Sequence, residues 1–185
     1  MREIWGAKMP PDNYEKLAKI LFSYDNPPGT EASSGAQDSI GLVFPGLAYA
    51  YFDGGYWPEY FIHRMDEPVL KVVEESLYLI PLGLRDEGFD VLADTHIDRE
   101  RAKALADATD ENWQAILDRD IVTFGRSLRE MFEAQVAMFP AMMNHRVKAV
   151  IDQYRDQALG WKLTGAGGGG YLVLVSEQPI ENGIR

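Results

Sequence analysis

Residues 165–170 read Gly-Ala-Gly-Gly-Gly-Gly and stand between two apolar segments, residues 161–163 and 171–175. Glycine loses more backbone entropy on ordering than any other residue, so consecutive glycines in a core-forming region are costly. A folded chain keeps them where side chains would obstruct a close backbone approach, a positive φ, or an anion bound by bare N–H groups. We therefore predict a strand, a glycine loop and a second strand, with the loop serving either as a ligand-binding surface or as a flexible hairpin tip.

The same run matches the dinucleotide-binding pattern G-x-G-x-x-G through Gly165, Gly167 and Gly170. That pattern works only when the glycine turn opens a helix and an acidic residue follows about 20 positions later. Here residues 171–175, Tyr-Leu-Val-Leu-Val, read as a buried strand. The sequence therefore argues against a dinucleotide site.

Composition excludes several classes of function. The chain has no cysteine, which rules out disulfides, thiol nucleophiles and thiolate metal sites. A net charge of −11 argues against nucleic-acid binding, which needs clustered Lys and Arg, but allows a small phosphorylated ligand held by a few amides. With no signal-peptide pattern and no long apolar run, we expect a cytoplasmic protein without membrane contact.

The first third of the chain predicts a helix and a hairpin. Residues 12–24 show helical apolar spacing after a Pro-Pro pair, with Asp12 as the N-cap. Residues 37–47 begin as a second helix, which Pro45-Gly46 ends. Residues 48–52 and 60–62 read as strands on either side of a turn at Asp53-Gly54-Gly55.

The remainder predicts strands that flank a helical region. Residues 76–82 form a strand that ends at Gly83; Asp98 caps a short helix to about residue 108, and Thr109 or Asp110 opens a long one through Gln135. Residues 144–157 form a further helix, with Gly160 as its C-cap. This order predicts the α+β class, an antiparallel sheet covered on one face by helices.

Two segments contain candidate functional residues. Lys162 and Thr164 stand at the entrance of the glycine run, which could cradle a phosphate. Asp38 follows small residues at the start of a predicted helix, where its carboxylate could orient or deprotonate a hydroxyl, or could simply cap the helix. Arg85 directly follows a strong strand, and strand ends often face sites.

The other candidates have structural explanations of equal or greater weight. His63, His96 and His145 lack the spacing of metal ligands, so no metal-binding residue is predicted. Aromatic residues between 49 and 60 could stack on a sugar, although aromatics on strands more often pack in the core; they are Tyr49, Tyr51, Tyr56, Trp57 and Tyr60.

Three segments together resemble the GHMP kinases, the family of galactokinase, homoserine kinase, mevalonate kinase and phosphomevalonate kinase. Residues 162–171, Lys-Leu-Thr-Gly-Ala-Gly-Gly-Gly-Gly-Tyr, resemble the third conserved motif, in the form found in heptose-phosphate kinases and L-fucokinases. Residues 34–41, Ser-Gly-Ala-Gln-Asp-Ser-Ile-Gly, resemble the Gln-Asp segment of that branch, and residues 79–85 its strand-Gly-x-Arg segment. The resemblance extends over roughly residues 12–178.

The resemblance implies a fold and an activity. It implies a ferredoxin-like C-terminal kinase domain over residues 67–185 and a remnant of the N-terminal domain over residues 1–66. Such kinases transfer the γ-phosphoryl group of ATP, with Mg²⁺, to a hydroxyl of a sugar or sugar phosphate. By resemblance Asp38 is the catalytic residue, the phosphate-side loop comprises Thr164, Gly165, Ala166, Gly167, Gly168, Gly169 and Gly170, and the substrate contacts are Ser34, Gly35, Gln37 and Arg85.

The sequence also departs from the family pattern. The Pro-x-x-x-Gly-Leu-Gly-Ser-Ser loop that binds ATP in the family is missing, and Ser39 stands where a residue such as Gln is expected, which leaves the sugar open. We therefore expect the C-terminal part of a kinase that is inactive by itself and assembles as a homodimer or with its missing N-terminal half. The alternatives are a non-catalytic binding or regulatory module of the same descent, and an unrelated α+β protein whose glycine hairpin binds another anion.

Overall fold

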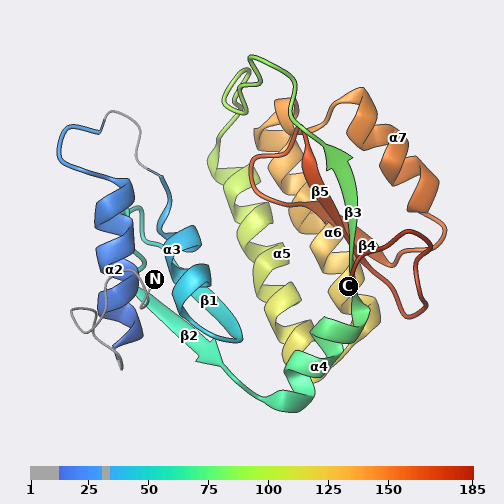
Figure 1. Ribbon diagram of the computed structural model, residues 1–185, viewed down its shortest axis with the longest axis horizontal. Coiled ribbons are helices and arrows are strands. Elements are labelled where there is room, and N and C mark those ends of the chain that lie inside the picture. The colour runs from blue at the N-terminus through green and yellow to red at the C-terminus, as the bar shows by residue number, and fades with distance from the viewer. Residues whose placement is uncertain (1–12, 31–33) are drawn as a thin grey trace. The chain divides into compact units, whose positions relative to one another are not determined.

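The computed structural model describes residues 13–30 and 34–185, which belong to two compact units, residues 1–66 and 67–185 (Figure 1). Within the described residues, no helix has both the length and the apolar character needed to cross a membrane.

The first unit contains two helices and a hairpin: α2 (Tyr14–Asp25), α3 (Ala36–Val43), β1 (Leu47–Tyr51) and β2 (Tyr60–Arg64). The predicted hairpin is confirmed, since β1 and β2 pair antiparallel. The predicted cap Asp12 lies outside the described residues, and the cap of α2 is Asn13, whose Oδ1 accepts a hydrogen bond from the Lys16 amide at 2.8 Å. A small core of Ala18, Ala36 and Ile40 joins the two helices.

The second unit is an antiparallel sheet covered by helices, as predicted. Its strands are β3 (Leu77–Gly83), β4 (Gly160–Leu163) and β5 (Gly170–Val175), in the spatial order β3-β5-β4. Its helices are α4 (Glu67–Ser76), α5 (Arg99–Asp118), α6 (Ile121–Met138) and α7 (His145–Tyr154), with a short 3-10 helix η2 (Pro140–Met142). Figure 1 shows the three strands side by side, with α6 and α7 beside them.

One face of this sheet forms the main core. Alternate residues of β3, namely Tyr78, Ile80 and Leu82, are buried with Leu172 and Leu174 of β5, as expected for a strand period of two. Helices α6 and α7 cover the same face, because their apolar residues belong to the same core cluster; these are Phe132, Val147, Ile151 and Tyr154. The confirmed fold class is therefore α+β.

The predicted division of the helical region near residue 109 is wrong. One helix, α5, runs from Arg99 to Asp118, and the Thr109 hydroxyl donates to the Leu105 carbonyl at 2.7 Å within it. The break lies at Arg119, which has a φ of 60°, and at Asp120, whose carboxylate accepts the Val122 and Thr123 amides, each at 3.1 Å. Asp120, rather than Thr109 or Asp110, is therefore the cap that starts the second long helix.

The predicted role of Gly160 is also wrong, and helix α4 was not predicted. Helix α7 ends at Tyr154, and Gly160 begins β4, where it lies against Gly125 of α6. A Cβ on Gly160 would lie 1.7 Å from the Gly125 carbonyl oxygen, so the helix and the strand approach through two glycines. The start of α4 carries a usable signal, an acidic residue followed by Pro68 in the first turn.

Candidate functional site

The glycine loop, defined as residues 164–170, joins the antiparallel strands β4 and β5. Its base is closed by Thr164, whose amide donates to the Tyr171 carbonyl at 3.0 Å and whose Oγ1 accepts the Tyr171 amide at 3.3 Å. At its other end, Gly170 pairs with Gly83 of β3. The predicted strand, loop and strand are confirmed, and the loop lies over the end of β3.

The backbone of the loop requires glycine. Gly165, Gly167, Gly168 and Gly170 have φ values of 60°, 76°, 71° and 82°, in the left-handed region that other residues rarely adopt. Gly169 is needed for a different reason, since a Cβ there would lie 2.8 Å from the backbone nitrogen of Arg85. The glycines thus fix the loop conformation and allow it to pack closely on the segment after β3, which a free hairpin tip would not do.

Three side chains and one carbonyl anchor the loop. Arg85 donates from Nε to the Gly167 carbonyl at 2.9 Å, and Asn144 donates from Nδ2 to the Gly168 carbonyl at 3.2 Å. The Gly168 amide donates to the Met142 carbonyl at 3.4 Å, and the ring of Phe89 lies against the Gly168 Cα. The loop is therefore held from two directions, by the segment after β3 and by the start of α7.

The anchored loop leaves hydrogen-bond donors available. Gly165 is exposed and Ala166 is half-buried, and among the residues that the structure describes none accepts a hydrogen bond from their amides. Arg85 is exposed, and its two Nη groups form no ion pair with a carboxylate of the described residues. Backbone amides next to an arginine fork are the donors that proteins use for phosphate and carboxylate oxygens.

Arg146 supports the segment that carries Arg85. Its Nη1 donates to the Leu84 carbonyl at 2.9 Å, and its Nη2 lies 3.1 Å from the Asp86 carboxylate. Sequence reasoning identified Arg85 but missed Asn144, Arg146 and Phe89. Asn144 could have been noticed in the sequence as a capping residue at the start of a helix, and it does cap α7 by accepting the Val147 amide at 2.9 Å. No sequence pattern marks Arg146 or Phe89 as part of the site.

Lys162, predicted at the loop entrance, makes its contact elsewhere. Its ammonium donates to the side-chain oxygen of Gln135 on α6. Burial lowers the pKa of Lys162 to about 8, because burial disfavours the charged form of a lysine. Lys162 is therefore part of the contact between β4 and α6 and is not a donor of the loop.

Asp38 lies in the first unit, in the first turn of α3. The cap of that helix is Gly35 and Asp38 lies three residues after it, so the alternative explanation of Asp38 as the helix cap is wrong. Its side chain is exposed, as are Ser34, Gly35 and Gln37. Ser34 is fixed by Asn26, whose Oδ1 accepts the Ser34 amide at 2.8 Å. The start of α3 thus presents a carboxylate beside polar groups, in a position that the helix dipole favours for an anion.

The aromatic residues of the first unit mostly pack on one another. The ring centroids of Tyr51 and Tyr60 lie 5.1 Å apart in a stack across the hairpin, and Trp57 meets Phe22 edge-on at 5.8 Å. A ring nitrogen of His63 is hydrogen-bonded to the Pro45 carbonyl. Over residues 13–30 and 34–185, no cluster of three or more His, Asp and Glu side chains could hold a metal ion.

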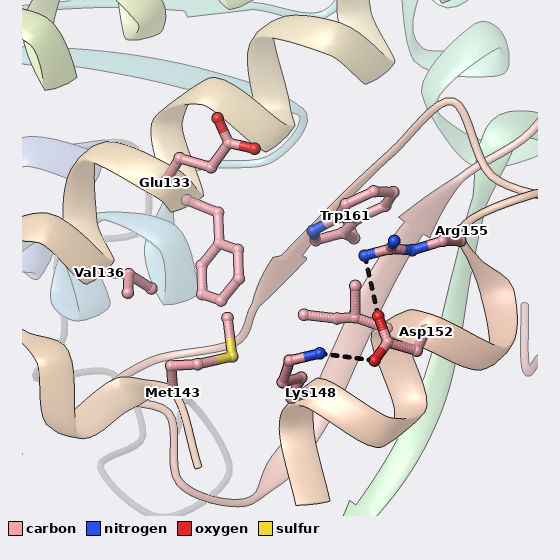
Figure 2. Close-up of a pocket in the computed structure, with 9 residues that line it drawn as sticks. Glu133, Val136, Met143, Lys148, Asp152, Arg155 and Trp161 are labelled. Carbon is pink, nitrogen blue, oxygen red and sulfur yellow. Dashed lines mark hydrogen bonds and ion pairs between the residues drawn. The ribbon is translucent and has the colours of Figure 1, made fainter. Parts of the chain in front are cut away.

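A separate cavity of about 330 Å³ lies between α6, α7 and β4. Figure 2 shows Trp161, Val136 and Met143 around it, with Asp152 between Lys148 and Arg155 at its rim. Each of the two cations lies 2.8 Å from the Asp152 carboxylate. None of the site residues expected from the sequence lines this cavity.

The comparisons with known proteins agree with the fold. No family model matches the chain. Over 74 residues, 40% of its length, the chain is 42% identical to an L-fucokinase/L-fucose-1-P guanylyltransferase of Bacteroides fragilis, of which it covers 8%.

Similar solved structures cover nearly the whole chain. A D-glycero-D-manno-heptose 1-phosphate kinase from Bacteroides thetaiotaomicron matches with a TM-score of 0.59 and 17% identity, over 91% of this chain and 46% of its own. A mevalonate kinase matches with a TM-score of 0.66 and 15% identity, over 95% of this chain and 52% of its own. The chain therefore spans about half the length of these structures. The resemblance to GHMP-type kinases is confirmed at the level of the fold.

Proposed function

We propose that this chain, which has the fold of GHMP-type kinases, is part of an ATP-dependent kinase that phosphorylates a hydroxyl of a sugar or sugar phosphate. The observation that carries the proposal is the anchored glycine loop, with the amides of Gly165 and Ala166, which have no acceptor among the described residues, and the Arg85 guanidinium at its edge. In this proposal residues 67–185 are the C-terminal kinase domain, and residues 1–66 a remnant of the N-terminal domain.

The loop would act mainly by positioning. In phosphoryl transfer the protein aligns the reactants and stabilises charge on the phosphoryl oxygens. The amides of Gly165 and Ala166 would donate to these oxygens, with Arg85 adding charge-assisted bonds. Because the loop is already fixed by its contacts, little ordering of the backbone would be needed on binding.

Asp38 would accept the proton of the substrate hydroxyl that receives the phosphoryl group. The acceptor oxygen attacks the γ-phosphorus, the bond to the bridging oxygen of ADP breaks, and the acceptor proton passes to the Asp38 carboxylate. Ser34, Gly35 and Gln37 at the same helix start would contact the substrate. Mg²⁺ would arrive on the nucleotide, since Mg²⁺ commonly binds substrate phosphates and water with few protein ligands.

We expect the chain of 185 residues to bind MgATP weakly and to show no kinase turnover, because its sequence lacks the Gly-Leu-Gly-Ser-Ser loop. Isothermal titration calorimetry with MgATP, followed by an assay for ADP release with and without sugars, measures both. Inorganic tripolyphosphate serves as the control ligand, since it tests the glycine loop without the nucleoside. Micromolar MgATP affinity together with sugar-dependent ADP release would contradict the expectation.

A second candidate function is a binding module that no longer transfers phosphate. The observation that favours it is the cavity beside Trp161, which is independent of the glycine loop and has an apolar floor suited to a small ligand (Figure 2). Calorimetry with tripolyphosphate on the wild type and on Arg85→Ala separates the two functions. Heat that Arg85→Ala abolishes indicates binding at the glycine loop, whereas heat that persists in Arg85→Ala indicates binding at the cavity, whose lining includes Lys148 and Arg155.

A further inference from the structure

Phe89 lies on the segment between β3 and α5, and its ring occupies the space that a side chain at position 168 would fill. Three ring atoms lie 2.4, 2.6 and 2.7 Å from the position of a Cβ on Gly168. Gly168 is buried and has a φ of 71°, so only glycine fits both the conformation and the contact. The ring of Phe89 therefore packs directly on the backbone of the glycine loop.

The same ring contacts the arginine of the site. The guanidinium carbon of Arg85 lies 5.7 Å from the centre of the Phe89 ring, within the range of a cation–π contact. Arg85 is bound at the same time to the Gly167 carbonyl through Nε. Phe89, Arg85 and the loop are thus in mutual contact.

Phe89 is itself held in place. Its amide donates to the Asp86 carbonyl at 3.1 Å, which closes a turn, and the Asp86 carboxylate is paired with Arg146. Arg146 also binds the Leu84 carbonyl. A continuous set of contacts therefore runs from α7, through Arg146 and Asp86, to Phe89 and on to Arg85 and Gly168.

We propose that Phe89 is a positioning residue, which holds Arg85 and Gly168 in the arrangement that binds phosphate oxygens. The assignment to phosphate rests on the proposed function; the positioning itself rests on the contacts above. An arginine on an exposed segment is otherwise free to adopt many rotamers and to pair with nearby carboxylates. Glu87 and Asp90 are exposed on this same segment, and the contact with Phe89 would hold the guanidinium at the loop and hinder its pairing with them.

The test compares Phe89→Ala with Phe89→Tyr, which keeps the ring, and with Leu92→Ala, an exposed residue of the same segment. The first readout is the exchange rate and chemical shift of the Arg85 Nε–H, measured by NMR without ligand. The second is the dissociation constant for tripolyphosphate. We expect Phe89→Ala to lose protection of the Arg85 Nε–H and to raise the dissociation constant about tenfold, with Phe89→Tyr and Leu92→Ala close to the wild type.

Gly168→Ala tests the same contact from the other side, because its added methyl group would displace the ring. Both variants are checked for intact folding by the amide exchange of Leu172 and Leu174, which are fully buried in β5. An unchanged Arg85 signal in Phe89→Ala overturns the inference, even if the wild type binds tripolyphosphate. If the Arg85 signal is lost but the wild type binds no tripolyphosphate, the positioning role stands and the proposed phosphate site is wrong.

Discussion

Replacing Gly160 with alanine is expected to lower the free energy of unfolding of the unit 67–185 by about 3 kcal/mol or more. The added methyl carbon would lie 1.7 Å from the Gly125 carbonyl oxygen and 2.4 Å from its carbonyl carbon. Both are backbone atoms inside helix α6, so neither can move without shifting the helix away from β4. Since β4 pairs with β5, the strain would reach the strand that carries the end of the glycine loop.

The effect is measured by chemical denaturation and by amide exchange of Leu172 and Leu174 in β5. Gly41→Ala is the matched control, because a Cβ at Gly41 in helix α3 meets no atom within 4 Å. Alanine there is expected to stabilise its helix by roughly 0.5–1 kcal/mol. A Gly160→Ala protein as stable as the wild type would show that α6 and β4 do not approach as closely as described.

Replacing Asp38 with asparagine is expected to reduce sugar-dependent ADP release by about a hundredfold to ten-thousandfold. Asparagine keeps the size and polarity of the side chain but cannot accept the acceptor proton. Asp38 is exposed in the first turn of α3, where the loss of its charge is expected to cost no more than about 1 kcal/mol of helix stability. The measurement requires an assembly containing this chain that catalyses ADP release, so that a decrease in its rate can be measured.

Two controls separate this role from a structural one. Asp25→Asn changes another exposed carboxylate of the first unit, at the end of α2, and is expected to retain full activity. Asp38→Asn is also expected to bind tripolyphosphate as the wild type does, since the glycine loop is unchanged. An Asp38→Asn enzyme with more than a tenth of the wild-type rate would remove Asp38 from the mechanism.

Features set by neighbouring residues were predictable from the sequence. The strand, glycine loop and strand could be predicted because four glycines between two apolar segments leave few alternatives. The hairpin of β1 and β2 followed from Asp53-Gly54-Gly55 between aromatic strands. Arg85 was found because it directly follows a strong strand, and the structure brings it to the loop through Gly167.

Features that depend on residues distant in the sequence could not be predicted from it. In the sequence Gly160 is typical of a helix C-cap. In the structure, glycine is required at position 160 because Gly125, on a helix distant in sequence, packs against it. Phe89 and Arg146 carry no local signal, since their partners are Gly168 and Asp86 on other segments. The helix break after α5 was misplaced because both Thr109 and Asp120 resemble caps, and only hydrogen bonding distinguishes them.

The central claim is that the glycine loop, with Arg85, binds phosphate oxygens. An NMR titration of the chain with tripolyphosphate tests it most directly, because each amide reports separately. We predict saturable shifts at the amides of Gly165 and Ala166 and at the Arg85 Nε–H, and we predict that Arg85→Ala weakens the shifts of the two amides. Shifts confined to the surroundings of Lys148 and Arg155 at the separate cavity, or no shifts at millimolar ligand, would contradict the claim.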